Sequence, residues 1–461
     1  MNKLSKICDG ADWFDPEFQK VLNEELQEPA RFHRKQWEFV TIFLTLQKYG
    51  MLKADKLGLS LGGGNERVLY SIARHIKQLV VTDLYDNETS WDCARTDDPD
   101  EFIKASKPFA VEDKKLKALR MDMRYLDFAE NSFDFCYSSC AIEHIGKFED
   151  FVQHLNEVYR CLKEDGIYVF TTELQLGDTT IKDPNNYIFS PAYLNYIIEH
   201  NKLTPDCDPD ISITEHSVNF PLPSNIAALC YNGEKKFSDQ ALSQLPHLTQ
   251  LRGKYPFTSI LLIMRKSSQT RADKKVNFIN LEQTESFVTA ALNNYKDILK
   301  SSVVSFQPFS SLPDGVSRFY LDHSDFFKDH QNKKGDNETP FHTDYFWLSE
   351  GERQFSIKLL VDSAEELSKN ILQLRIHRYA ITDSEKVKCI FEKDIVLKTG
   401  DYINEDINII VNEEYCYAVL AKIASGSCTF KNISITSGLT QLATNTNEIK
   451  NFRDELSEII S

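Results

Sequence analysis

Long hydrophobic runs are missing from the 461-residue sequence, and their absence excludes whole classes of protein. A bilayer-spanning helix needs about 20 consecutive, predominantly apolar residues, and no stretch of that length occurs. The longest apolar patch near the N-terminus, residues 39–46, is interrupted by Thr41 and Thr45. Residues 1–15 also lack the apolar core of a secretory signal. We therefore expect no membrane span, no secretory leader and a cytoplasmic location.

The cysteines are too scattered for a disulfide framework or a zinc site, and the basic residues are too few to favour nucleic-acid binding. The ten cysteines lie between Cys8 and Cys428, without the dense, regular spacing of a disulfide framework. Cys136 and Cys140 have no matching second pair, so we expect no zinc site. The 69 acidic residues outnumber the 53 basic ones and give a net charge of -16. Such a charge disfavours a nucleic-acid partner, because the phosphate backbone is itself negative.

Short apolar runs alternate with helix-like segments through the first half of the chain. The candidate strands and helices are, in chain order, residues 57–61, 66–76, 78–84, 133–140, 148–163 and 166–174. Alternation at this pitch predicts a parallel sheet with crossover helices, an α/β fold of the doubly wound, Rossmann-like kind. A helical stretch over 17–50, broken at Pro29, precedes it, and an apolar strand at 258–266 follows.

The pattern changes in the last third of the chain. Residues 281–301 have helical periodicity, and after Pro313 short strand candidates recur between turn residues. This succession predicts an antiparallel β-sandwich, jelly-roll-like, at the C-terminus. The predicted domains are a helical N-terminal extension (1–50), an α/β domain (51–268), a linker with a helix (269–312) and a β-sandwich accessory domain (313–461).

Three consecutive glycines, Gly62, Gly63 and Gly64, stand between a candidate strand and a candidate helix. Without Cβ atoms the chain can turn tightly and let a ligand lie against its backbone; a plain glycine-rich turn is the alternative. Asp83 ends the next strand, 19 residues after Gly64, where a carboxylate can accept both ribose hydroxyls of an adenosine. Asp122 lies at a position where its carboxylate can accept a hydrogen bond from the exocyclic amine of adenine. Either acid could instead be a solvated surface residue.

Four ordered motifs resemble those of the class I S-adenosylmethionine-dependent methyltransferases. They are LSLGGGNE (59–66), VVTDLY (80–85), MDMRYLDFAENSFDFCYSSCAIEHI (121–145) and LNEVYRCLKEDGIYVFTT (155–172). The resemblance implies a methyltransferase domain over 51–268 with S-adenosyl-L-methionine as cofactor. It implies cofactor contacts at Leu61, Gly62, Gly63, Gly64, Asp83, Leu84, Asp122, Met123 and Ser138. Two positions depart from the family pattern, because its first acid is Ser60 here and its third glycine is Glu66, which alters the contacts expected for the methionine amine.

Methyl transfer from this cofactor is an in-line displacement that needs alignment, and sometimes a base to take a proton from the acceptor. His144, just after the fourth strand, is the predicted base, because a neutral imidazole can accept a hydroxyl proton near neutral pH. Glu143 would orient His144 or touch the acceptor. The alternative is that the two residues cap the next helix or shape the pocket. Cys140 is predicted to be pocket wall, and no metal is required.

The methyl acceptor is predicted from two weaker sequence similarities. Residues 33–40 (HRKQWEFV) and 91–102 (WDCARTDDPDEF) are similar to a methyltransferase subgroup often associated with glycan biosynthesis. The sequence therefore favours O-methylation of a sugar or glycan, with the sandwich binding the glycan or mediating homo-oligomerisation. A small-molecule N- or O-methyltransferase and a non-catalytic binding protein are the alternatives. His342, Thr343 and Asp344 have the form of an iron-ligand motif, but no third ligand stands out, so a surface turn is favoured.

Overall fold

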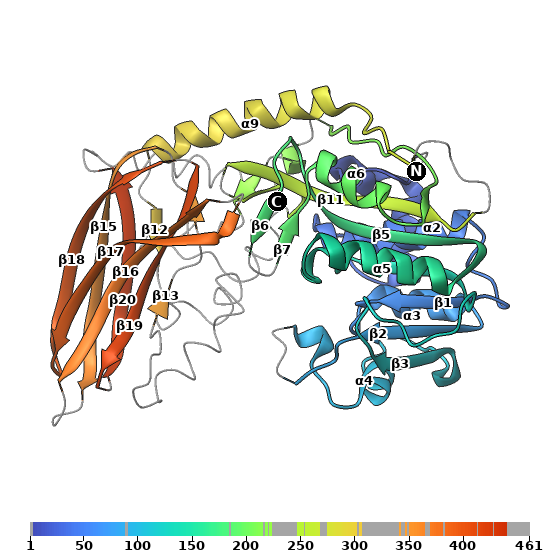
Figure 1. Ribbon diagram of the computed structural model, residues 1–461, viewed down its shortest axis with the longest axis horizontal. Helices are drawn as coiled ribbons and strands as arrows, with labels where there is room; N and C mark the ends of the chain where they lie inside the picture. Colours follow the sequence, from blue (N-terminus) through green and yellow to red (C-terminus); the bar gives the residue numbers. More distant parts are fainter. Residues whose placement is uncertain are drawn as a thin grey trace. The chain divides into compact units, whose positions relative to one another are not determined.

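A computed structural model gives the structure of the chain, which folds into two compact units (Figure 1). The residues described are 3–87, 91–183, 186–214, 217–219, 221–223, 247–252, 254–267, 274–301, 304–306, 341–342, 346–347, 350–364, 369–380, 383–412, 414–426 and 428–439. Unit 1 comprises Met1–Phe220, Pro246–Thr249 and Pro256–Val288, and unit 2 comprises Pro221–Leu245, Gln250–Tyr255 and Thr289–Ser461.

The central sheet of unit 1 confirms the predicted Rossmann-like fold. Its strands run in the order β3 (Leu116–Arg120), β2 (Gln78–Asp83), β1 (Leu57–Leu61), β4 (Phe133–Ser139), β5 (Leu162–Gln175) and β11 (Tyr255–Arg265). The first five strands pair in parallel, and β11 pairs antiparallel with β5. The chain order reverses between β1 and β4, and open α/β sheets bind their ligands at such a switch point.

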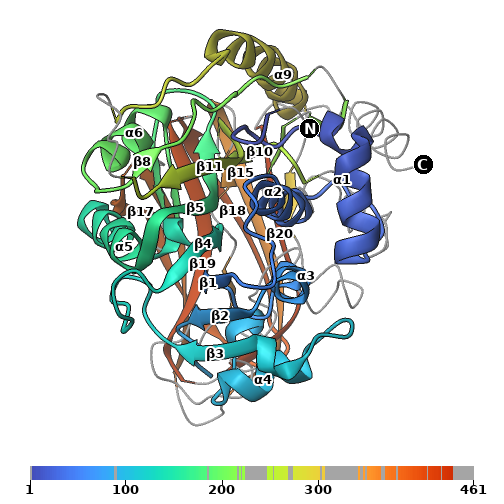
Figure 2. The same ribbon diagram turned by 90° about the vertical axis from the view of Figure 1, so that its right-hand side faces the viewer.

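Helices cover both faces of this sheet, as Figure 2 shows. α5 (Phe148–Cys161) and α6 (Pro191–Glu199) lie on one face, and α2 (Arg34–Lys48) and α3 (Arg67–His75) lie on the other. α4 (Pro99–Ala105) packs beside the edge strand β3. The predicted alternation of strand and crossover helix is therefore confirmed.

Shorter elements connect these helices and strands. The helical turns are η1 (Gly10–Phe14), α1 (Pro16–Lys20), η2 (Val21–Leu26), η3 (Asp92–Ala94), η4 (Asp113–Lys115), η5 (Ile142–His144) and η6 (Ser217–Asn219). The short strands of unit 1 are β6 (Ile181–Asp183), β7 (Asn186–Ile188) and β8 (Thr204–Pro205), whereas β9 (Leu222–Pro223) and β10 (Gln250–Arg252) belong to unit 2. β6 and β7 form an antiparallel pair, β8 pairs with β11, and β9 and β10 form a parallel pair.

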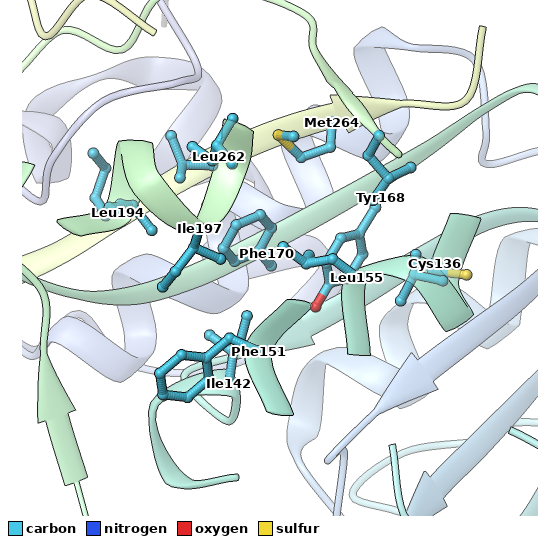
Figure 3. Packing of buried hydrophobic residues seen from close by; sticks show 14 of the residues in the cluster. Cys136, Ile142, Phe151, Leu155, Tyr168, Phe170, Leu194, Ile197, Leu262 and Met264 are labelled. Carbon is cyan, nitrogen blue, oxygen red and sulfur yellow. The ribbon is translucent and has the colours of Figure 1, made fainter. Parts of the chain in front are cut away.

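Apolar side chains at helical spacing fix α5 on the sheet (Figure 3). Phe151 and Leu155, four residues apart, are buried in one cluster with Tyr168 and Phe170 of β5. Complete burial of one such side chain contributes about 1.5–3 kcal/mol. Ile142, at the start of η5, belongs to the same cluster. The core therefore anchors the short segment after β4 that carries two of the predicted site residues.

The N-terminal extension is part of the core of unit 1. Trp37 of α2 is fully buried, and its indole Nε1 donates to Oδ2 of Asp12 at 2.7 Å. Thr41 and Thr45, which interrupt the apolar patch, are also buried. Their hydroxyls donate to backbone carbonyls one turn earlier, at 2.8 and 2.7 Å, so two polar groups enter the core without losing hydrogen bonds. The predicted break at Pro29 falls between η2 and α2.

Unit 2 is an antiparallel β-domain, as the sequence predicted. Its strands are β12 (Val304–Phe306), β13 (Phe341–His342), β14 (Phe346–Trp347), β15 (Gly351–Ala364), β16 (Asn370–Ala380), β17 (Asp383–Leu397), β18 (Tyr402–Val411), β19 (Tyr415–Ser425) and β20 (Cys428–Leu439). One sheet has the order β12-β20-β15-β18, and the other has the order β13-β19-β16-β17, with β14 also paired to β19. Apart from β14, this is the strand order of a jelly roll.

The predicted domain boundaries stay predictions. α9 (Leu281–Ser301) spans the change from unit 1 to unit 2, and β12 lies inside the stretch predicted as a linker. Thr343 and Asp344 of the predicted surface turn lie outside the described residues. Among the described helices, none combines the length and apolar character needed to cross a bilayer.

Candidate active site

The glycine loop between β1 and α3 is closely packed and leaves no room for side chains. Gly62 and Gly64 have φ angles of +63° and +45°, a region that residues with a Cβ rarely adopt. A Cβ on Gly62 would lie 2.5 Å from the Cβ of Ala141, and one on Gly64 would lie 2.7 Å from the carbonyl oxygen of Cys93. The loop is thus held between the segments that follow β4 and β2, as a backbone cradle that only glycines can form.

Asp83 lies beside this loop at the end of β2, where the sequence places it. Its Oδ2 accepts a hydrogen bond from the amide of Gly64 at 2.9 Å, and its Oδ1 accepts from the amide of Leu84 at 2.7 Å. Burial raises the pKa of Asp83, although these backbone hydrogen bonds oppose the shift. Each carboxylate oxygen keeps a second lone pair. Asp83 can therefore hold the glycine loop in place and still accept ribose hydroxyls.

The residues predicted on the adenine side lie in different settings. Asp122 pairs with Arg124 at 2.6 Å between Oδ2 and Nη2. Burial would raise the pKa of Asp122, but hydrogen bonds from Arg124 outweigh it and lower the pKa. Met123 is buried, with its sulfur 3.8 Å from where a Cβ on Gly62 would lie. Ser138 is buried on β4. Met123 thus lies next to the glycine loop. Asp122 already accepts hydrogen bonds from Arg124, so it has fewer lone pairs left for a ligand.

The segment after β4 carries Glu143 and His144 in opposite settings. Glu143 is 1% exposed, and its Oε2 accepts from the hydroxyl of Thr172 on β5 at 2.9 Å. Its Oε1 is buried without a hydrogen-bond partner in the part of the chain that the structure describes. Burial raises the pKa of Glu143 to about 7, with His144 opposing and Glu173 adding to the shift. His144 itself is exposed, and its ring centre lies 5.1 Å from that of Trp91.

Cys140 directly follows β4 and lies in the left-handed backbone region, with φ +49°. Its Sγ lies 3.8 Å from Oγ of Ser259 on β11. Burial raises the pKa of the Cys140 thiol, and Glu143 and Glu38 add to the shift. A thiol that stays protonated is a poor nucleophile. This chemistry disfavours Cys140 as a nucleophile, and its place in the wall of the pocket stays a prediction.

Charged residues at the start of α2 reach the same edge of the sheet. Arg34 Nη1 lies 2.7 Å from Oε1 of Glu173 on β5. Glu38 is 2% exposed as a side chain, and its Oε1 accepts from Ser259 at 2.6 Å. Lys35 pairs with both Glu38 and Glu66, which stands two residues after Gly64.

Sequence reasoning assigned no role in the site to Arg34, Lys35 or Glu38. The signal available in the sequence was their position in a predicted helix that is otherwise mostly apolar over residues 37–46. Polar atoms in such a helix need partners from elsewhere in the fold.

The arrangement fits a nucleoside ligand with a charged end. Gly62 and Gly64 form a cradle that a Cβ would fill, and Asp83 beside it offers free lone pairs. Two carboxylate oxygens at the same edge, Glu66 Oε2 and Glu143 Oε1, are buried without hydrogen-bond partners among the described residues. Buried polar atoms without partners are rare in folded proteins and mark places where a ligand can supply the missing donor.

Comparison with known families decides what the site belongs to. Residues 59–170, from β1 into β5, match a family model described as a methyltransferase domain. The chain carries a class I S-adenosylmethionine-dependent methyltransferase. The enzyme therefore uses S-adenosylmethionine as its cofactor, as the four sequence motifs predicted. No curated protein matches the methyltransferase sequence.

Solved structures similar to the methyltransferase share little sequence with it. Geranyl diphosphate C-methyltransferase from Streptomyces coelicolor A3(2) is 14% identical, over 58% of this chain and 91% of that chain, with a TM-score of 0.35. The 1,6-didemethyltoxoflavin-N1-methyltransferase from Burkholderia thailandensis is 11% identical, over 54% and 82%, with a TM-score of 0.33. A SAM-dependent methyltransferase from Aquifex aeolicus is 11% identical, over 54% and 99%, with a TM-score of 0.30.

Proposed function

We propose that this methyltransferase methylates a hydroxyl oxygen of a sugar or glycan in the cytoplasm, with Glu143 as the base. The environment of the Glu143 carboxyl group carries the proposal. One oxygen is fixed by Thr172, and the other has no partner among the described residues. Ala141, two residues earlier, packs against Gly62 of the glycine loop. A pKa of about 7 matches a base that works near neutral pH.

The cofactor residues follow from the glycine loop and its neighbours. Bound S-adenosylmethionine supplies an activated methyl group on its sulfur. Gly62, Gly63 and Gly64 would lie against it with their backbone, and Asp83 would accept from its ribose hydroxyls. The remaining proposed contacts are Leu61, Leu84, Asp122, Met123 and Ser138. No metal is part of this proposal.

Glu143 would act in its carboxylate form. It would take the proton of the acceptor hydroxyl while the oxygen becomes methylated, which leaves Glu143 protonated and the product an ether. Thr172 holds one carboxylate oxygen in place, so the other is left to face the acceptor. This assignment replaces His144 as the proposed base, because the Glu143 carboxyl group is buried and held by Thr172, whereas the ring of His144 is exposed.

The groups around Glu143 suit an acceptor rich in hydroxyls. The Arg34–Glu173 pair and the Glu38–Ser259 hydrogen bond place charged and polar atoms next to the same strand ends. Binding sites with a few converging polar groups fix the orientation of polar ligands. Trp91 is 52% exposed and offers an aromatic face beside His144. Such a face can pack against the carbon-bound hydrogens of a sugar ring.

Replacing Trp91 by alanine should raise KM for the sugar acceptor about 2- to 12-fold, the loss expected for one aromatic packing contact. The dissociation constant for S-adenosylhomocysteine should not change, because Trp91 is proposed to touch only the acceptor. Steady-state kinetics and calorimetric titration measure the two effects. Phe14→Ala, which removes another exposed aromatic ring of unit 1, is the matched control. Unchanged KM would remove Trp91 from the acceptor site.

The acceptor class can be tested with a panel of nucleotide sugars, free oligosaccharides and small amines. Formation of S-adenosylhomocysteine is measured with each candidate at equal concentration. We expect turnover with hydroxyl-bearing sugars and none with amines that lack hydroxyl groups. Turnover with amines alone would favour a small-molecule N-methyltransferase instead.

We propose that the jelly roll is an accessory domain that binds a long glycan or holds a homo-oligomer together. It would then raise the local acceptor concentration without taking part in the chemistry. A chain ending at Ser301 should therefore still bind S-adenosylhomocysteine with the affinity of the full chain. It should lose affinity for a long acceptor, or its oligomeric state. Calorimetry and light scattering measure these effects. An insoluble truncated chain, or one without cofactor binding, would mean that the two units need each other.

A further inference from the structure

We infer that Glu66 and Lys35 form the subsite for the amino-acid end of the cofactor. Glu66 accepts hydrogen bonds from the α-ammonium group, and the positive charge of Lys35 attracts the α-carboxylate. The inference rests on S-adenosylmethionine as the cofactor and adds the residues that recognise its zwitterionic end. It concerns the two positions where this chain departs from the family pattern, Ser60 and Glu66.

Glu66 is the less satisfied of the two carboxylates that face Lys35. The Nζ of Lys35 lies 2.9 Å from Oε2 of Glu38 but 3.4 Å from Oε1 of Glu66. The other oxygen of Glu66, Oε2, is buried and has no hydrogen-bond partner among the described residues. A buried carboxylate oxygen without a donor is costly. An ammonium group placed there would supply the missing donors.

The position of Glu66 puts its carboxyl group close to the glycine loop. Glu66 follows Gly64 by two residues and precedes α3, yet its side chain makes no capping hydrogen bond to that helix. It turns toward Lys35. The charge of Asp83, beside the glycine loop, adds to the rise in the pKa of Glu66, and Glu66 in turn adds to the rise in the pKa of the Cys93 thiol. The proposed amino-acid subsite and the ribose acid therefore lie at the same strand ends.

Lys35 spans the switch point of the sheet. Its Nζ donates to the carbonyl oxygen of Ser139 at 3.1 Å and to its hydroxyl at 3.3 Å, at the end of β4. On the other side it faces Glu66, which follows the loop after β1. The Lys35 ammonium, which reaches the end of β4 from α2, and the Glu66 carboxylate after β1 match the two charges of an α-amino acid, which are separated by a single carbon.

The charges around Lys35 favour the binding of one more cation at Glu66. Burial would raise the pKa of Glu38, but Lys35 and Arg34 outweigh it and lower the pKa to about 2, so Glu38 stays charged and holds Lys35. Burial raises the pKa of Glu66 to about 7, with Lys35 opposing and Glu38 adding to the shift. Lys35 thus forms ion pairs with two carboxylates. The pair with Glu66 is the longer one, so Glu66 can bind a second cation.

Ser60 cannot take over this role. Its side chain is fully buried under the glycine loop, where a Cβ on Gly63 would lie 2.2 Å from its Oγ. A hydroxyl also lacks the charge that makes a carboxylate bind ammonium strongly. The acidic group that the family keeps at the end of β1 is therefore supplied here from six residues further along the chain.

Three ligands separate the amino-acid subsite from the rest of the cofactor site. S-adenosylhomocysteine carries both charged groups, its decarboxylated analogue keeps only the amine, and 5′-methylthioadenosine lacks both. In calorimetric titrations of the full chain, Glu66→Gln should weaken the first two about 10- to 150-fold, the range for a hydrogen bond to a charged group. Its affinity for 5′-methylthioadenosine should stay within about two-fold of wild type. Wild type should also prefer S-adenosylhomocysteine to its decarboxylated analogue, since only the former reaches Lys35.

The controls exclude a general loss of structure. Glu149→Gln changes an exposed carboxylate in the first turn of α5 and should leave all three affinities unchanged. Glu66→Asp keeps the charge on a shorter arm and should weaken only the two amine-bearing ligands, which tests the proposal if Glu66→Gln does not fold. Equal weakening of all three ligands, or unchanged affinity for the decarboxylated analogue, would overturn the assignment of Glu66. Equal wild-type affinity for S-adenosylhomocysteine and its decarboxylated analogue would overturn that of Lys35.

Discussion

Replacing Glu143 by glutamine should lower kcat about 10²- to 10⁴-fold, the contribution typical of a general base. Glutamine keeps the size of the side chain and can still accept from Thr172, so the segment after β4 should keep its shape. It cannot take a proton from the acceptor. Affinity for S-adenosylhomocysteine should therefore stay near that of wild type, as measured by calorimetry beside single-turnover kinetics.

The pH dependence of kcat/KM provides a second test of Glu143, because kcat/KM reports the pKa values of the free enzyme. Burial raises the pKa of Glu143 to about 7, so the carboxylate form gains population, and kcat/KM should rise, as the pH increases through this value. The charged and titratable groups that act on Glu143 are His144 on its own segment, Glu173 on β5 and the thiol of Cys140. His144→Ala is the matched control and should keep the rising limb. A large loss of kcat in His144→Ala, with Glu143→Gln near wild type, would restore His144 as the base.

The second large effect is expected at Asp83. Its replacement by alanine removes the acceptor proposed for the ribose hydroxyls and also the hydrogen bond from the amide of Gly64. We expect affinity for S-adenosylhomocysteine and for 5′-methylthioadenosine to fall alike, about 10- to 150-fold, because both ligands carry the ribose. Calorimetric titration with the two ligands measures this loss.

Two variants show whether the effect at Asp83 is local. Asp83→Asn keeps one carbonyl oxygen for the Gly64 amide and should lose less affinity than Asp83→Ala. Asp55→Ala removes an exposed acid shortly before β1 and should change nothing. Unchanged affinity in a folded Asp83→Ala variant would show that the ribose is held elsewhere.

The fold of unit 1 could be predicted from the sequence because its signals are local. The strands at 57–61 and 78–84 and the helix after Gly64 each follow from runs of apolar residues within one segment. The glycine loop and Asp83 could be placed for the same reason, since each stands at the end of a predicted strand. The jelly roll of unit 2 was predicted from successive short strands separated by turn residues.

The polar residues around the site could not be predicted in this way, because their partners are far apart in the sequence. Glu38 meets Ser259 across 221 residues, and Lys35 meets Ser139 across 104. Nothing in the spacing of a helix or strand links such pairs. The roles of Glu143 and His144 could not be separated either, since adjacent residues differ in burial only once the core around Ile142 is formed.

The most direct test of the account is to find where the methyl group goes. The full chain is incubated with S-adenosylmethionine carrying an isotopically labelled methyl group and with the sugar acceptor that gives the fastest turnover. Nuclear magnetic resonance of the product then identifies the methylated atom, for wild type and for Glu143→Gln. The account predicts the label on a hydroxyl oxygen of the sugar in wild type and little product in the variant. Label on nitrogen or carbon, or equal product from both proteins, would contradict it.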